Sequence, residues 1–152
     1  MNKSKVYFTA LRAPVGTSQL TKLQRLIRSA GIGEIDMEKK LVAIKLHFGE
    51  PGNLTYLRPN YAKAVADVVK ELGGVPFLTD CNTLYPGRRK NALEHIESAY
   101  ENGFSPFSTG CQVIIGDGLR GNDDVEVPVA GASMWRRLRS AAPSWTQMCS
   151  SA

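Results

Sequence analysis

Short apolar segments alternate with longer amphipathic segments along residues 5–129, and this alternation restricts the chain to few folds. The apolar segments have the length of strands and cover residues 5–11, 41–48, 75–79, 113–116 and 125–129. Between them, apolar residues repeat every three to four positions over residues 17–31, 59–72 and 91–102. Strands separated by helices are joined by right-handed crossovers, which produce parallel pairing. The pattern predicts a three-layer, Rossmann-like α/β fold, with a mostly parallel sheet and helices on both faces.

The helical segments also carry signals for their ends and for their buried faces. Thr17 or Ser18 can cap the first helix, and Pro59 suits the first turn of the second. We expect His95, on the third helix, at the surface, and Cys111 buried before a strand. The third helix is expected to turn four residues inward: Leu93, Ile96, Ala99 and Tyr100.

Composition excludes several classes of protein. Hydrophobic residues make up 43% of the 152 residues, enough for a buried core, which excludes a disordered chain. No apolar run approaches the roughly 20 residues of a membrane span, and the first residues lack the apolar stretch of a signal peptide. Three widely spaced cysteines exclude a disulfide scaffold: Cys81, Cys111 and Cys149. We therefore expect a cytoplasmic protein that does not bind membranes.

The net charge of +5 makes nucleic acid a candidate partner, because basic proteins can bind nucleic acid. Three arginines lie in a carboxy-terminal stretch without acids: Arg136, Arg137 and Arg139. Without them, 16 basic residues face 14 acidic ones, and no aromatic residues interleave with a basic stripe. We therefore expect no nucleic-acid partner.

Polar residues gather where the predicted strands end. In a parallel sheet the carboxyl ends of the strands form one edge, and ligands bind outside it. Six candidates follow the second, third and fourth strands: Lys45, His47, Glu50, Asp80, Asn82 and Asp117. Imidazole and carboxylate groups perform acid–base chemistry or hold a divalent metal ion. We predict His47 and Asp80 as catalytic residues, and His47, Asp80 and Asp117 as possible metal ligands.

Substrate binding is assigned to a second set of residues: Lys45, Glu50, Asn82 and Arg88. Arg88 precedes the third helix, whose start can bind an anion. Each candidate has a structural alternative. Asp117, between two glycines, suits a turn, His47 can simply be hydrogen-bonded, and the basic run around Arg88 can be a solvated loop.

Several long motifs resemble one family. They are KLHFGEPGN (45–53), FLTDCNTLYPGRRKNALEHIESAYENGF (77–104) and VIIGDGLRGNDDVEV (113–127). Together they are similar to an uncharacterised family of iron–sulfur centre proteins, domain of unknown function 362, over residues 5–129. The resemblance implies a cytoplasmic bacterial or archaeal protein, much longer than this chain and often ending in a ferredoxin-like [4Fe–4S] domain. It implies five signature residues: His47, Glu50, Asp80, Asn82 and Asp117.

The resemblance implies two kinds of function for the intact protein. It would be redox or metal-dependent, with a cleft at the carboxyl ends of the strands, or a non-catalytic scaffold that positions the ferredoxin-like domain for a partner. A [4Fe–4S] cluster needs closely spaced Cys thiolates, which the three cysteines of this chain do not supply. We expect no iron–sulfur ligand and no cofactor in this fragment, and no activity from it alone.

The composition changes near residue 130. Residues 133–152 contain both tryptophans, three arginines, five serines and no acid, without a helical or strand period. One codon assignment for this stretch, read in another frame, encodes a strand–helix–strand pattern like the family's continuation. We hypothesise an α/β domain over residues 1–129, incomplete at its carboxyl end, followed by a frameshifted, poorly ordered tail over 130–152. The rival interpretation is a native amphipathic tail.

Overall fold

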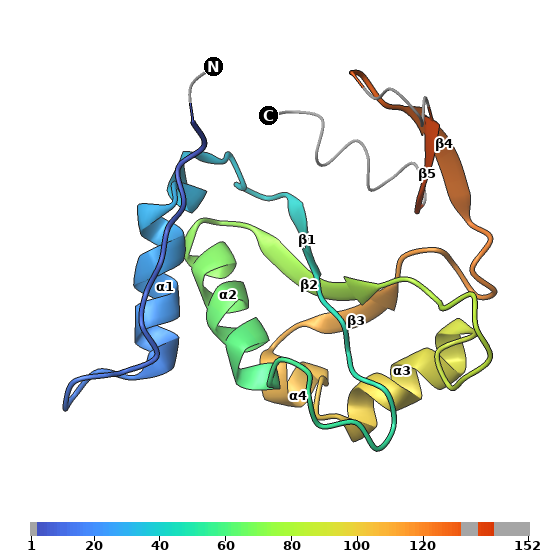
Figure 1. Cartoon of the computed structure of the whole chain (residues 1–152), viewed down its shortest axis with the longest axis horizontal. Helices are drawn as coiled ribbons and strands as arrows, with labels where there is room; N and C mark the ends of the chain where they lie inside the picture. Colours follow the sequence, from blue (N-terminus) through green and yellow to red (C-terminus); the bar gives the residue numbers. More distant parts are fainter. Residues whose placement is uncertain (1–2, 132–136, 142–152) are drawn as a thin grey trace.

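The computed structural model describes residues 3–131 and 137–141, and it has an α/β fold (Figure 1). Three parallel strands form the main sheet in the order β1-β2-β3: β1 (Leu41–Lys45), β2 (Val75–Asp80) and β3 (Gln112–Ile115). The helices are α1 (Gln19–Ser29), η1 (Ile32–Glu34), α2 (Pro59–Glu71), α3 (Ala92–Glu101) and α4 (Pro106–Thr109). The predicted α/β class with a parallel, Rossmann-like sheet is confirmed.

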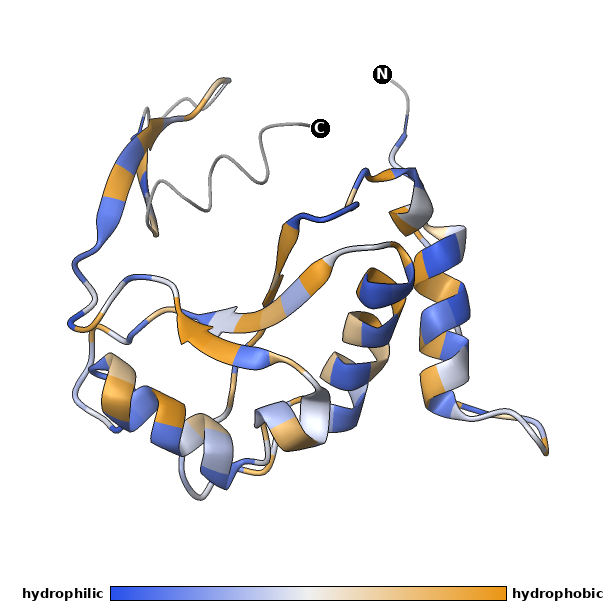
Figure 2. Ribbon diagram, turned by 180° about the vertical axis from the view of Figure 1, so that it is seen from behind, coloured by the Kyte–Doolittle hydropathy of each residue, from blue (hydrophilic) through white to orange (hydrophobic). Residues whose placement is uncertain are grey.

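The strand order decides where the helices lie. From β1 to β2 and from β2 to β3 the chain moves the same way across the sheet, so right-handed crossovers place α2 and α3 on one face. Helix α1, capped by the Ser18 hydroxyl, packs on α2 (Figure 1). Figure 2 gives the reverse view, with hydrophobic residues in all three strands.

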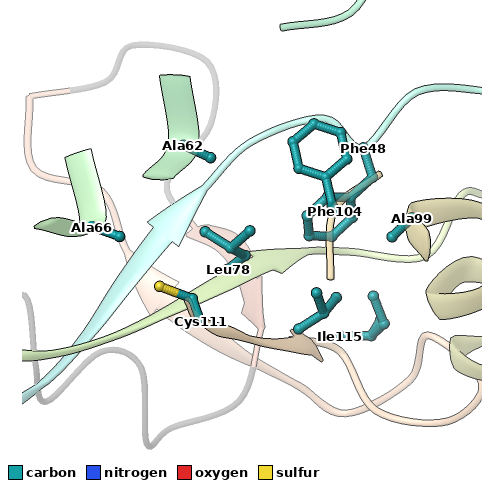
Figure 3. Packing of buried hydrophobic residues seen from close by; sticks show 9 residues of the cluster. Phe48, Ala62, Ala66, Leu78, Ala99, Phe104, Cys111 and Ile115 are labelled. Atoms are coloured by element: carbon teal, nitrogen blue, oxygen red, sulfur yellow. The ribbon is translucent and has the colours of Figure 1, made fainter. Parts of the chain in front are cut away.

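The core lies between this face of the sheet and the helices (Figure 3). Leu78 of the central strand is fully buried, as are Phe48 and Phe104, whose rings meet edge to face at 5.3 Å. Small residues let the helices approach the sheet closely: Ala62 and Ala66 of α2 and Ala99 of α3. Cys111 is buried, as predicted.

The opposite face of the sheet carries no helix within residues 3–131 and 137–141. Ala43 and Lys45 are exposed there, and Ile114 retains 45% of its accessible surface. The predicted second helical layer is therefore not formed by the described part of the chain. A second, two-stranded antiparallel sheet consists of β4 (Asp124–Pro128) and β5 (Arg137–Ala141).

The strand predicted over residues 5–11 does not form. Val6 and Phe8 are 90% and 85% exposed, and the segment runs beside α1, where Lys22 Nζ donates hydrogen bonds to the carbonyls of Ala10 and Arg12. Apolar alternation produces a strand only where another strand offers a pairing edge and a surface to cover. Neither is provided to this segment by the described residues.

The buried face of α3 differs from the prediction. Leu93 and Tyr100 are 65% and 47% exposed, whereas His95, Ser98 and Ala99 are completely buried. The expectation of a surface histidine is wrong. The helix is turned so that His95 Nε2 lies 3.6 Å from Asp80 Oδ2 at the end of β2 and the Ser98 hydroxyl donates to the Gly49 carbonyl at 3.4 Å, while Leu93 and Tyr100 stay exposed.

Part of the predicted tail lies in β5, which pairs with β4 from Asp124↔Ala141 to Pro128↔Arg137. Residues 132–136 and 142–152, including both tryptophans and Cys149, lie outside the described residues. The domain boundary at residue 129 and the frameshift therefore stay predictions. No helix in the described part of the chain has the length and apolar character needed to cross a membrane.

Candidate functional site

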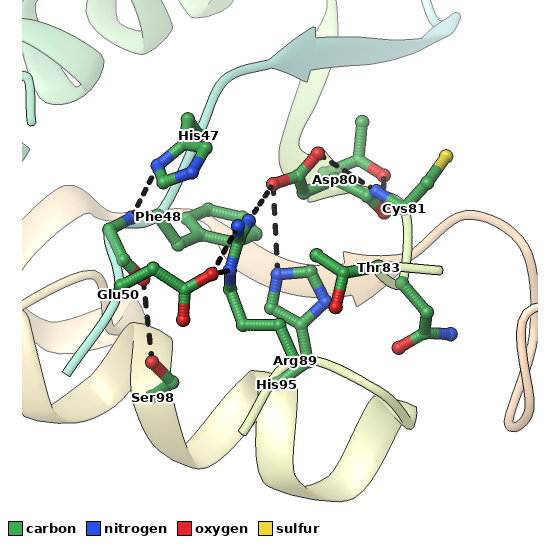
Figure 4. Close-up of polar contacts among 12 residues, drawn as sticks. His47, Phe48, Glu50, Asp80, Cys81, Thr83, Arg89, His95 and Ser98 are labelled. Carbon is green, nitrogen blue, oxygen red and sulfur yellow. Dashed lines mark hydrogen bonds and ion pairs between the residues drawn. The ribbon is translucent and has the colours of Figure 1, made fainter. Parts of the chain in front are cut away.

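Two loops meet at the carboxyl ends of β1 and β2 and carry most of the candidate residues (Figure 4). The first loop is anchored by the buried Phe48, whose carbonyl accepts a hydrogen bond from Asn102 Nδ2 at 2.9 Å. The next residue, Gly49, has a φ of +88°, and an added Cβ would lie 2.5 Å from the Tyr56 ring. Only glycine fits this position, so the sequence Phe-Gly-Glu fixes the path of the chain between His47 and Glu50.

Asp80, the last residue of β2, is the centre of a buried ionic network. Its side chain is 7% exposed and contacts Lys45 Nζ through Oδ1 and Arg89 Nη1 through Oδ2, the latter at 3.3 Å. The Cys81 backbone N–H donates a further hydrogen bond to Oδ1 at 2.9 Å. Burial raises the pKa of this carboxyl, but His95, Lys45 and the Cys81 N–H outweigh it and lower the pKa from 3.8 to about 2. Asp80 is therefore a permanent anion near neutral pH.

Arg89 joins the two loops. It is 3% exposed, and its Nε donates to Glu50 Oε1 at 2.6 Å, while Nη2 donates to the Tyr85 hydroxyl at 2.6 Å. That hydroxyl in turn donates to Glu50 Oε1 at 2.6 Å. Hydrogen bonding from Arg89, assisted by Tyr85, lowers the pKa of Glu50. The arrangement is a closed set of charged hydrogen bonds, which holds the loops in one relative position.

His95 lies under this network. Its ring is fully buried, packs edge-on against Phe48 at 5.8 Å, and places Nε2 3.6 Å from Asp80 Oδ2. That separation is an ion-pair distance and is too long for a direct hydrogen bond. Neither ring nitrogen has a hydrogen-bond partner among the described residues. His95 thus supports Asp80 electrostatically from the protein interior.

His47 and Lys45 lie on the other side of the same strand. Ile44 and Leu46 pack toward the core, so the residues that alternate with them point away from it, and both Lys45 and His47 are exposed. The Gly49 backbone N–H donates to His47 Nδ1 at 2.9 Å. Because Nδ1 accepts, the proton of the neutral ring resides on Nε2, which is left as a hydrogen-bond donor.

Asn82 and Asp117 connect the end of β2 to the loop after β3. The Asn82 backbone N–H contacts Asp117 Oδ1 and Oδ2 at 2.9 and 3.0 Å, and its Nδ2 donates to Oδ1 at 2.9 Å. Asn82 Nδ2 also donates to the Gly118 carbonyl at 2.9 Å. Asp117 is 8% exposed, so three N–H contacts compensate its charge. The Asn82–Asp117 pair therefore links the loop after β2 to the loop after β3.

The loop containing Asp117 has regularly spaced glycines that resemble a nucleotide-binding motif. Residues 116–121 read Gly-Asp-Gly-Leu-Arg-Gly and match the spacing of dinucleotide-binding loops, Gly-x-Gly-x-x-Gly. In those proteins the loop opens a helix, whose amino terminus holds the pyrophosphate. This loop leads instead into β4, and Gly118 and Gly121 adopt positive φ within a tight turn. The motif therefore has a structural role here.

Not every predicted residue joins the site. The structure brings together Lys45, Asp80 and Glu50, with Asn82 and Asp117 next to them through Cys81. Arg88 turns away and pairs with Glu97 and Glu101 on α3. Sequence reasoning missed three contributors: Tyr85, Arg89 and His95. The run Arg88-Arg89-Lys90 signalled a cation, but nothing in the sequence distinguished the buried arginine from its exposed neighbour.

The family model "Domain of unknown function (DUF362)" matches residues 42–146, which is more than half of the chain. The chain belongs to the DUF362 family. No curated protein and no solved structure matches it. Membership agrees with the resemblance stated from the motifs, and the matched range includes every candidate residue of the strand-end site.

The DUF362 chain does not fit a [4Fe–4S] cluster. Such a cluster needs four cysteine thiolates, and the sequence contains three cysteines. Cys111 is buried in the apolar core, and burial raises the pKa of its thiol and of the Cys81 thiol. Both cysteines are free thiols. A cluster associated with this domain must therefore take its ligands from elsewhere.

Metal binding by the DUF362 domain depends on how its His, Cys, Asp and Glu side chains are placed. Among residues 3–131 and 137–141, no group of three or more His, Cys, Asp and Glu side chains is placed to hold a metal ion. Asp80 and Asp117 direct their oxygens to nitrogen donors within the protein. The metal-ligand role of His47, Asp80 and Asp117 stays a prediction.

Proposed function

We propose that this DUF362 domain is the substrate-binding part of an iron–sulfur-associated redox protein. Family membership supports the assignment only as far as a domain of unknown function. The iron–sulfur association rests on the motif resemblance, which implies a ferredoxin-like [4Fe–4S] domain in longer members. The cluster would be supplied by that domain or by a redox partner, since the cysteines of this chain do not fit one.

The observation that carries the proposal is the exposed His47 ring at the end of β1, near the buried ionic network of Asp80, Arg89 and Glu50. Its Nδ1 is fixed by the Gly49 N–H, which leaves Nε2–H as a hydrogen-bond donor that can orient and polarise a substrate. Asp80 is a positioning residue in this proposal, because its low pKa and its contacts with Lys45 and Arg89 keep it ionised. The proposed setting is the cytoplasm.

The test uses the longer protein that the motif resemblance implies. It should contain iron and acid-labile sulfide, and removal of the Nε2–H donor in His47→Ala should shift the cluster's reduction potential. Lys63→Met, which removes an exposed α2 side chain paired with Asp67, should leave the potential unchanged. Absence of iron and sulfide would end the redox proposal.

A non-catalytic scaffold is the second candidate. The helix-free face of the sheet, exposed at Ala43 and Ile114, favours it because a neighbouring domain could pack there. If the longer protein contains a cluster, but His47→Ala and Asp80→Asn leave its potential unchanged, the scaffold is the better description. This chain would then contribute only by holding the ferredoxin-like domain in position.

A further inference from the structure

We propose that the substrate of this site carries a carboxylate or phosphate group, which binds between Lys45 Nζ and His47 Nε2–H. This inference rests on the proposed function and names the chemical class of the ligand. It derives from three features of the strand end: a cation that can change partners, a directed N–H donor two residues further along the same side of the chain, and neighbouring acids that are hydrogen-bonded within the protein.

Lys45 can move away from Asp80 without leaving this carboxylate unpaired. The Lys45 side chain is 61% exposed, whereas Asp80 is buried and also contacts Arg89 Nη1 and the Cys81 N–H. When Lys45 turns toward a ligand, those two donors still bond the Asp80 carboxylate. An exposed ammonium on a flexible stem is well suited to a phosphate or carboxylate, which it binds as a point charge.

His47 supplies a second, directional contact. It lies two residues beyond Lys45, on the same side of the extended chain, while Ile44 and Leu46 pack toward the core. The Gly49 N–H fixes Nδ1 as the acceptor, so Nε2–H points away from the backbone as a donor. An oxyanion suits an ammonium and an N–H group that project from the same side of the chain two residues apart.

The nearby carboxylates are bonded within the protein. Glu50 accepts hydrogen bonds from Tyr85 and from Arg89, whose positive charge offsets its own. Asp117 accepts hydrogen bonds from the backbone and side chain of Asn82, which stabilise its charge without cancelling it. Repulsion of an anionic ligand is therefore reduced by Arg89, which also contacts Asp80. The side of β1 that carries Lys45 and His47 has no helix over it in the described part of the chain.

The experiment titrates the 152-residue chain with inorganic phosphate and with succinate, against sodium chloride at equal ionic strength. The chain has two histidines, so His47→Gln assigns the His47 ring resonance in NMR spectra. We expect a saturable shift of that resonance with phosphate, succinate or both, and none with chloride. Lys45→Met should weaken binding at least about tenfold, and Lys45→Arg should retain most of it.

The matched control is Lys40→Met, since Lys40 precedes the same strand at its opposite end and pairs with Asp36. It should leave binding unchanged, and a cooperative unfolding transition for each variant shows that it is folded. No saturable shift with either anion, or equal weakening by Lys40→Met, would overturn the proposal. The iron content and the reduction potential of the longer protein are measured independently of anion binding, so either result can fail without the other.

Discussion

The two sides of the β1–β2 strand ends differ in how completely their polar groups are bonded. On the helix-covered side, Asp80, Arg89 and Glu50 are linked through several charged hydrogen bonds, and Arg89 is 3% exposed. On the opposite side, Lys45 and His47 are exposed, with one hydrogen bond each in the described part of the chain. Saturated groups fix a structure, whereas unsatisfied exposed atoms are available to a ligand.

The largest expected effect is on the saturated side. Arg89→Met removes the partner of Glu50 and one partner of the buried Asp80, which leaves carboxylates poorly compensated in a region of low polarity. Breaking such a buried pair costs about 3 to 5 kcal/mol. We expect the free energy of unfolding, measured by urea denaturation, to fall by this amount or the chain to be unfolded.

The adjacent arginine provides the control for this experiment. Arg88 pairs with Glu97 and Glu101 at the protein surface, where solvent screens the interaction. Arg88→Met should therefore change the unfolding free energy little. If the two variants lose the same stability, the distinction between a bonded interior and an exposed surface at the start of α3 is wrong.

The second prediction concerns acid. The pKa of Asp80 is lowered from 3.8 to about 2, so the unfolded chain binds this proton more readily than the native one. The stability from its ionised form is complete above about pH 4 and is lost as the pH falls through 2, a change of about 2 kcal/mol. Urea denaturation between pH 5 and pH 2 measures it, and Asp80→Asn should make the decline shallower.

The outcome that contradicts this prediction is an equal decline in the wild-type chain and in Asp80→Asn. The acid sensitivity would then come from other carboxylates with lowered pKa values, such as Glu50. A matched comparison is possible because Asn keeps the shape of Asp80 and can still accept a hydrogen bond from the Cys81 N–H.

The third prediction tests the loop that separates the two sides. Gly49 and Gly52 both have positive φ, +88° and +81°, so alanine is strained at each. An added Cβ at Gly49 would also lie 2.5 Å from Tyr56 Cδ1 and 2.7 Å from Asn102 Nδ2, whereas Gly52 has nothing within 4 Å. Thermal and urea unfolding should show Gly49→Ala to be less stable than Gly52→Ala by about 1 to 2 kcal/mol. Equal losses would mean that Tyr56 moves aside without cost.

Local patterns in the sequence predicted the parallel sheet and most helix positions, because strand length, caps and apolar spacing are encoded within a few residues. The Ser18 cap and the start of α2 at Pro59 are examples. The predicted strand over 5–11 failed because a strand also needs a partner edge, which no local pattern reveals. The collection of polar residues at one edge followed from the topology of parallel sheets.

Local sequence patterns did not predict which individual side chains enter the site. Whether Arg88 or Arg89 enters the interior depends on the path of the loop before α3, where Glu50 and Asp80 from other segments pair with Arg89. Burial of His95 has the same origin, since its partner Asp80 is 15 residues away in the sequence. Polar partners that are distant along the chain therefore determine that Arg89 and His95 are buried, although hydrophobicity alone would leave both at the surface.

The smallest effect tests the exposed side directly. His47→Ala removes the Nδ1 atom that accepts the Gly49 N–H, so the Gly49 amide resonance should shift in NMR spectra of this variant. Its free energy of unfolding should change by no more than about 0.5 kcal/mol. The Gly52 amide, which lies in the same loop, should shift much less. If the Gly49 amide does not shift, Nδ1 is not the acceptor, the proton on Nε2 is no longer assigned, and the contrast between a bonded side and an available side loses its second member.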